Sequence, residues 1–179
     1  MNIWANAVIT DKGLALQAKL TQGHTLEITR AVTGAGYVMP AMLAKQAEVT
    51  DPKLALHMKA ATYPEIGKCA LLLDMNNDDV TAGYTARQVG IFANDPDEGE
   101  ILYFIAQAAD ENTGTIIPSA AEMPGYSAEW TFYFQYGQAD RVDITVDPTG
   151  TVSRAEMEIY INQRFAPITN EQIDAILGE

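Results

Sequence analysis

The stretch from residue 80 to 108 constrains the fold most, because it holds two apolar segments joined by an acidic turn. The second segment, 100–108, is apolar on both faces, with Ile101, Tyr103 and Ile105 on one and Leu102, Phe104 and Ala106 on the other. A strand of this kind is usually covered on both sides. The turn, residues 94–99, contains Asp, Pro and Gly, which are typical turn residues. The sequence therefore predicts a hairpin at the centre of a mostly β domain.

Alternating apolar and polar residues predict the strands around this hairpin. The expected strands cover residues 26–32, 53–62, 67–75, 84–93, 129–136 and 141–147. In the first of them, Leu26, Ile28, Arg30 and Val32 are expected to share one face. A tight link at 137–140 joins the last two. Most of the chain is thus expected to form antiparallel β-structure.

Two helices are expected within the first 50 residues. Thr10 is suited to cap a helix, and Asp11 suits the positive end of its dipole. A second, short helix is expected at 40–50, opened by Pro40. The predicted fold class is α+β, with a mostly antiparallel sheet or sandwich core, an N-terminal helix and a short helical C-terminal tail.

The pattern changes after residue 150. Capping boxes at Ser153–Glu156 and Thr169–Gln172 predict two short helices. Helices of this length are marginal alone in water, so their apolar faces need a surface. These faces carry Met157, Tyr160, Ile161, Ile173, Ile176 and Leu177. We therefore divide the chain into a domain at 1–150 and a docking tail at 151–179.

Composition bounds the partners. The 179 residues include 24 acidic and 11 basic side chains, giving a net charge of −13. Such a surface repels nucleic acid and anionic membranes. The N-terminus lacks the features of a signal peptide, and no apolar run reaches the roughly 20 residues of a membrane span. The single cysteine, Cys69, lies in an apolar run and is expected to be a buried, inert thiol.

The search for chemistry finds no catalytic, cofactor or metal motif. Residues 34–36 read Gly-Ala-Gly, but Met39 stands where a phosphate loop needs its third glycine. Residues 74–78 match the first ligands of a calcium loop, yet Asp79 and Thr85 stand where Gly and Glu are required. We therefore expect no enzyme activity and no cofactor. The long loop at 109–127 is a candidate contact region, because loops of this length are often functional.

The hairpin also resembles a known family. Its pattern consists of Tyr84, Arg87, Gly90, Ile91, Phe92, the turn from Asp95 to Glu100, Leu102 and Tyr103. This pattern is similar to the N-terminal domain of bacteriophage tail-fibre proteins, in the form found in prophages of Gram-positive bacteria. Residues 8–14, 26–36 and 142–150 also resemble that family. The resemblance covers roughly residues 1–150.

The resemblance implies a structural protein of a phage or phage-like contractile tail. In the family this domain anchors a fibre to the baseplate, and fibres are usually trimers. The expected location is thus the virion tail, assembled in the bacterial cytoplasm, with tail, baseplate or fibre proteins as partners. Family members commonly continue into a shaft, whereas two predicted helices follow here, which favours an attachment or adaptor role. Arg87, in the family-like pattern, is expected to pair with a carboxylate in the fold or across a subunit contact.

One alternative belongs to a different functional class. Trp130, Phe132, Phe134 and Tyr136 form an aromatic row in the predicted strand 129–136. If this row were exposed, it would suit a carbohydrate-binding module, because sugars stack on aromatic rings. A hydrolase using surface carboxylates is a third, weaker interpretation. Exposure of Trp130 and Phe132 distinguishes the carbohydrate module from the tail protein.

Overall fold

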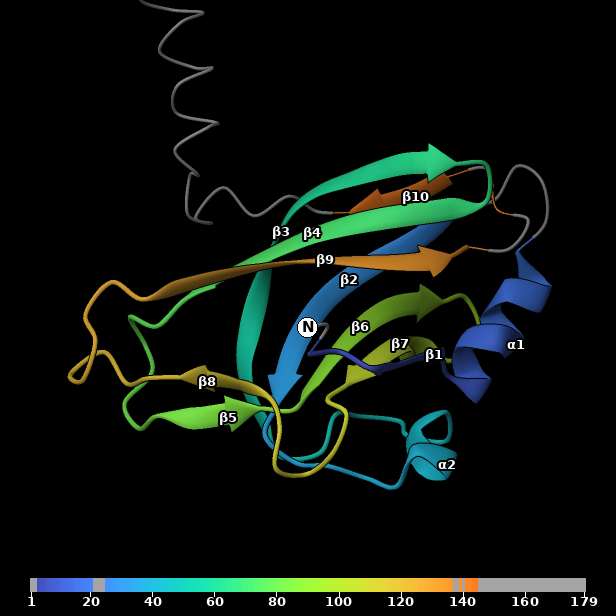
Figure 1. Cartoon of the computed structure of the whole chain (residues 1–179). Helices are drawn as coiled ribbons and strands as arrows, with labels where there is room; N and C mark the ends of the chain where they lie inside the picture. Colours follow the sequence, from blue (N-terminus) through green and yellow to red (C-terminus); the bar gives the residue numbers. More distant parts are fainter. Residues whose placement is uncertain (1–2, 21–24, 137–138, 140, 145–179) are drawn as a thin grey trace, which may run out of the picture.

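The computed structural model describes residues 3–20, 25–136, 139 and 141–144, and the secondary structure below refers to these residues. The chain forms one large, curled sheet and a small two-stranded sheet (Figure 1). In order, the elements are β1 (Asn6–Ile9), α1 (Asp11–Lys19), β2 (Thr25–Gly34), α2 (Pro40–Leu43), β3 (Pro52–Glu65), β4 (Lys68–Asn76), β5 (Tyr84–Ala86), β6 (Gln88–Asp95), β7 (Gly99–Gln107), β8 (Thr115–Ile117), β9 (Ser127–Gln135) and β10 (Arg141–Ile144). The described fold is therefore largely β, where the sequence predicted α+β.

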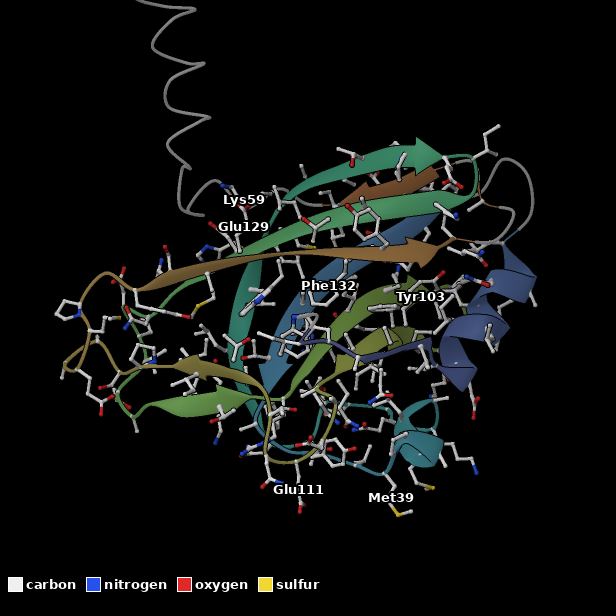
Figure 2. All side chains as sticks on the ribbon, in the orientation of Figure 1. Met39, Lys59, Tyr103, Glu111, Glu129 and Phe132 are labelled. Carbon is white, nitrogen blue, oxygen red and sulfur yellow. The ribbon has the colours of Figure 1, made fainter. Side chains whose placement is uncertain are left out.

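The large sheet has the order β1-β7-β6-β2-β3-β4-β9, with every neighbouring pair antiparallel. It curls so far that its two ends approach one another, and β9 lies above β1 and β7 in the view of Figure 1. Aromatic rings fill the space between: Phe134 lies 5.8 Å from Tyr103 and 5.6 Å from Phe104, centroid to centroid. Figure 2 shows Phe132 and Tyr103 in this interior. One curled sheet thus makes the core that the sequence predicted as a sheet or sandwich.

The predicted hairpin is confirmed as β6 and β7, and both of its faces are buried. Its first strand was expected at 84–93, but Tyr84–Ala86 form the separate strand β5, which pairs with β8, and β6 begins at Gln88. Its concave face joins the main core, in which Val89, Ile91 and Ala93 lie as expected. On the convex face Phe92, Leu102 and Ile105 form a second, smaller core with Val32, Leu43 and Val49. Leu43 and Val49 belong to the segment 36–50, which crosses this face and contains α2. The hairpin is therefore covered by β9 on one side and by residues 36–50 on the other.

Two bulges change which side chains share a face. Ile91 of β6 pairs with Phe104 of β7, but the next residue, Phe92, pairs with Leu102. Tyr103 is therefore an extra residue in β7. Phe104 consequently joins Tyr103 in the main core, and Ile105 faces the small core, opposite to the simple alternation expected from the sequence. In β2 a shift between Ile28 and Arg30 likewise sends Val32 to the small core.

Three further elements differ from the sequence prediction. The helix expected at 40–50 is the single turn α2, Pro40–Leu43. Strand β10 pairs with β2, in parallel, although it follows β9 in the chain. Strand β3 pairs only with the second half of β2, so β10 pairs with the first half, which β3 does not reach. Strand β1 was not predicted at all, whereas β2, β3, β4 and β9 lie close to their expected ranges.

Helix α1 begins as the sequence predicts. The side chain of Thr10 accepts a hydrogen bond from the Gly13 N–H, and Leu16 is fully buried against the main core. At the other end of the helix, Lys19 Nζ lies 2.8 Å from Oδ1 of Asp95, the last residue of β6 before the turn to β7. The same carboxylate oxygen accepts from the N–H groups of Asp97 and Glu98. The turn and the helix end are thus fixed by one buried carboxylate.

This carboxylate makes stability depend on pH. The hydrogen bond from Lys19, followed by the N–H groups of Asp97 and Glu98, lowers the pKa of Asp95. A lowered folded-state pKa contributes stability above the unfolded value of about 3.9, and this contribution disappears as pH falls through the folded pKa. We expect Asp95→Asn to lower the free energy of unfolding at pH 7, and the deficit to shrink below about pH 4. Urea titrations across that range measure it.

The matched control is Asp97→Asn, because Asp97 also contacts Lys19, at 3.0 Å, but its side chain is 74% exposed. Exposed ion pairs contribute little, so this variant should stay within about 0.5 kcal/mol of the wild type. A deficit in Asp95→Asn that does not change with pH would show that the charge of Asp95 is not its cause.

Candidate functional site

The long loop predicted at 109–127 is an ordered flap. We use the term flap for residues 109–126, which leave β7 and return to β9. Strand β8 lies in its middle and pairs with β5, forming the small sheet beside the main one (Figure 1). Ile117 is fully buried and fixes this strand to the body, while the neighbouring Ile116 is 73% exposed. The flap therefore presents the Ile116 side chain to solvent on a backbone that the pairing of β8 with β5 holds in place.

Arg87 holds the start of the flap. Its Nε donates to the Glu111 carbonyl at 2.7 Å, and its Nη1 donates to the Ala35 carbonyl at 2.7 Å. Figure 2 labels Glu111 at the foot of the molecule. In the described fold, Arg87 thus bonds to two main-chain carbonyls and not to the carboxylate that the sequence predicted. A carboxylate across a subunit contact remains a prediction.

Asn77 holds the end of the flap. This residue is fully buried, and its Nδ2 donates to the carbonyls of Pro118, at 3.1 Å, and Met123, at 2.9 Å. Its own N–H donates to the Tyr126 carbonyl at 3.0 Å. Two bonds from the Asn77 side chain and one from its main-chain N–H thus define the path of residues 118–126. In the sequence, Asn77 stood out only as part of the calcium-like run at 74–78.

A small cap completes this end. The Glu122 carboxylate accepts from the N–H and the hydroxyl of Ser119, at 3.0 and 2.8 Å, and the Glu122 N–H donates back to Ser119 Oγ. These bonds from Ser119, the N–H first and then the hydroxyl, lower the pKa of Glu122. The sequence Ser-x-x-Glu at 119–122 has the form of a capping box, which is the signal that reveals this feature.

Between these anchors lies a groove of about 660 Å³, which we call the flap groove. Tyr84, Thr85, Ile116, Met123 and Tyr126 are among its lining residues. Met123 is 53% exposed, so the groove offers two large apolar side chains, Ile116 and Met123, to a partner. A groove with such a lining suits binding, since exposed apolar patches commonly mark contact surfaces.

Two features of the described residues bear on metal and thiol chemistry. Among them, no group of three His, Cys, Asp or Glu side chains is placed to hold a metal ion. Cys69 is fully buried, as predicted, and burial raises the pKa of its thiol to about 11, so the thiolate is scarce at neutral pH. The helices that the structure describes include none long and apolar enough to cross a membrane.

The aromatic row of β9 faces the core. Phe132, Phe134 and Tyr136 are 5–6% exposed, and Trp130 is partly buried against Trp4, with ring centroids 5.9 Å apart. The exposed residues of β9 are on its other face, as with Tyr133. The exposure on which the carbohydrate alternative depended is therefore not met.

The predicted contact residues of the tail, Met157, Tyr160, Ile161, Ile173, Ile176 and Leu177, lie outside the described residues. The docking tail at 151–179 thus remains a prediction from sequence. Comparison with known proteins found no matching family model, no matching curated protein and no matching solved structure.

Proposed function

We propose that this chain is a structural component of a phage or phage-like contractile tail, where it attaches a fibre to the baseplate or serves as a short fibre or adaptor. The observation that carries the proposal is the flap groove, an apolar surface on a loop held by Arg87 and Asn77. A surface that is already ordered costs little to bind, which suits a protein whose task is assembly. The resemblance of residues 84–103 to tail-fibre domains supports the same class.

The proposed partners are other tail, baseplate or fibre proteins, and the proposed assembly is a homotrimer in the virion tail. An adaptor needs at least two contact surfaces. The flap groove is one candidate, and the tail at 151–179 is the other. The two lie in separate parts of the chain, so they can be altered independently.

Incorporation of the chain into particles tests this proposal. Two altered chains are compared with the wild type: one ends at Gly150, and the other carries Ile116→Asp. We expect the first to unfold near the full-length midpoint but fail to join baseplates or its fibre partner. We expect the second to be as stable as the wild type within about 0.5 kcal/mol, because Ile116 is exposed, and to assemble roughly tenfold less well. Sedimentation and electron microscopy of purified particles measure both.

Met39→Asp is the matched control, because Met39 is 72% exposed and lies outside the flap (Figure 2). It should assemble normally. If the chain ending at Gly150 is insoluble, the tail belongs to its own core and is not a docking element. If that chain and the Ile116→Asp chain both assemble normally, neither surface attaches the protein, and the proposed adaptor role is wrong.

A further inference from the structure

In the part of the chain that the structure describes, the curled sheet is not closed, and its two end strands each have a side that pairs with no described strand. Strands β1 and β9 stand at opposite ends of the strand order, and each pairs with one neighbour, β7 and β4 respectively. All six pairings between them are antiparallel, so β1 and β9 run in the same direction (Figure 1). One additional strand between them would be antiparallel to both and would close the seven strands into an eight-stranded antiparallel barrel.

The register shows which main-chain groups point into this opening. Thr10 N–H bonds to the Tyr103 carbonyl, and paired residues in an antiparallel ladder alternate between bonded and non-bonded. Val8 therefore bonds to β7, whereas the N–H and C=O groups of Ala7 and Ile9 point away from it. At the end of β9, the Tyr136 N–H bonds to the Gly67 carbonyl. The same alternation therefore makes the N–H and C=O groups of residues 131, 133 and 135 point away from β4. Two rows of main-chain donors and acceptors thus border the opening.

A groove of about 480 Å³ occupies this opening, and we call it the seam. Ala7, Ile9, Phe104, Tyr133 and Phe134 are among the residues that line it. Beyond the lining on one side, Trp4 packs on Trp130 and Phe132. The indole N–H of Trp4 is buried there with no acceptor among the described residues.

On the other side, Gln17 Nε2 and the Tyr103 hydroxyl donate to the Gln135 carbonyl, at 2.9 and 2.8 Å. This carbonyl is the outward acceptor of β9 nearest the helix, and it is already bonded. The free length of the seam therefore corresponds to Ala7–Ile9 on β1 and to residues 131–133 on β9. A segment of a few extended residues fits this length.

We propose that the seam binds an extended peptide segment of a partner protein, which adds a strand between β1 and β9. Main-chain bonds to two edges would supply affinity, and alternate side chains would supply specificity. Side chains that point inward meet Phe104 and Phe134 and are apolar. Side chains that point outward are basic, because the chain carries a net charge of −13 and favours a cationic partner.

A second copy of this chain fits the seam less well. If β1 paired with β1 of another copy, the free edge of β9 would stay without a partner strand in both copies. The same holds for β1 if the two β9 strands paired. Two copies also each carry −13, so they repel one another at low salt. This inference is independent of the proposed tail function, since it rests on strand register, the lining of the seam and the net charge.

The probe is a fluorescein-labelled hexapeptide of alternating lysine and valine, added to the full chain and followed by anisotropy. We expect saturable binding, and slower hydrogen exchange at the Ile9 and Tyr133 amides. The same peptide with every valine N-methylated lacks one row of donors and should bind at least roughly tenfold more weakly. An alternating glutamate and valine peptide should not bind detectably.

Proline substitutions identify the site. Ala7→Pro and Tyr133→Pro each remove an outward N–H that no sheet neighbour uses, and proline is tolerated at such edge positions. Each should weaken the lysine–valine peptide roughly tenfold. Ser127→Pro, at the first residue of β9 and outside the seam, is the matched control and should bind normally. If one seam variant fails to fold, the other and the N-methylated peptide still decide the question.

Three results would overturn the proposal. Equal binding of the plain and N-methylated peptides would mean attraction by charge alone. Reversible dimers without peptide binding would mean that a second copy occupies the seam. Unchanged affinity in folded Ala7→Pro and Tyr133→Pro chains would place the peptide elsewhere.

Discussion

Phe104→Ala is expected to lower the free energy of unfolding by about 3–5 kcal/mol. Phe104 is 4% exposed and stands in β7, where it touches the aromatic row of β9. Its ring centroid lies 6.2 Å from that of Phe132 and 5.6 Å from that of Phe134. Removing the ring opens a cavity between the two ends of the sheet, which no ladder between described strands holds together. The loss should therefore fall at the upper end of the range.

Urea denaturation at fixed pH measures this loss, with Met39→Ala as the control. Met39 is 72% exposed, so its truncation should change stability by no more than about 0.5 kcal/mol. Phe104→Leu keeps an apolar side chain of substantial volume and should cost clearly less than alanine. A measured loss below about 1 kcal/mol for Phe104→Ala would mean that β9 does not cover β7 in solution, and the curled architecture would be wrong.

The sequence predicted the strands well because apolar alternation reports burial directly. It predicted that β7 is covered on both faces, and the two cores confirm this. It failed at Tyr103 and near Thr29, where a bulge inserts one residue and exchanges the two faces beyond it. Nothing in the local composition distinguishes a bulged residue from a regular one. A bulge is decided by the neighbouring strands, in both cases around Phe92 of β6.

The candidate sites were only partly predictable for a similar reason. The loop at 109–127 stood out by its length, and its role as a contact region stays a prediction. Its apolar pair suggested an anchor, but only Ile117 is buried, whereas Ile116 is exposed. The roles of Arg87 and Asn77 depend on main-chain carbonyls that come from distant parts of the chain, and carbonyls leave no signature in a sequence. The seam depends on strand order, in which β1 and β9 end up at opposite edges.

A pair of buried glutamines carries the second large effect. Gln88, in β6, and Gln107, in β7, are both fully buried, and Gln88 Nε2 donates to Gln107 Oε1 at 2.7 Å. Gln88 Oε1 also accepts from the Thr50 N–H at 2.7 Å. Gln107 bonds to both the N–H and the carbonyl of Val38. The pair thus ties the segment 36–50, which covers the small core, to the hairpin beneath it.

Replacing either glutamine by leucine should cost about 2–4 kcal/mol, because polar groups lose partners in a buried place. Gln88→Leu leaves the Thr50 N–H without this acceptor, and Gln107→Leu leaves both main-chain groups of Val38 without theirs. Gln135→Leu is the control, because the Gln135 side chain is exposed on β9, and it should stay within about 0.5 kcal/mol of the wild type.

The double variant Gln88→Leu/Gln107→Leu distinguishes a network from two separate sites. Each single variant also removes the hydrogen bond between the two side chains and leaves the remaining glutamine with an unsatisfied polar group. In the double variant both glutamines are gone, so this cost does not arise. Its loss should therefore be smaller than the sum of the single losses by about 1 kcal/mol or more. Strict additivity in the urea midpoints, with unchanged slopes, would mean that the glutamines act independently. Segment 36–50 would then be held by its apolar contacts through Leu43 and Val49 and not by this pair.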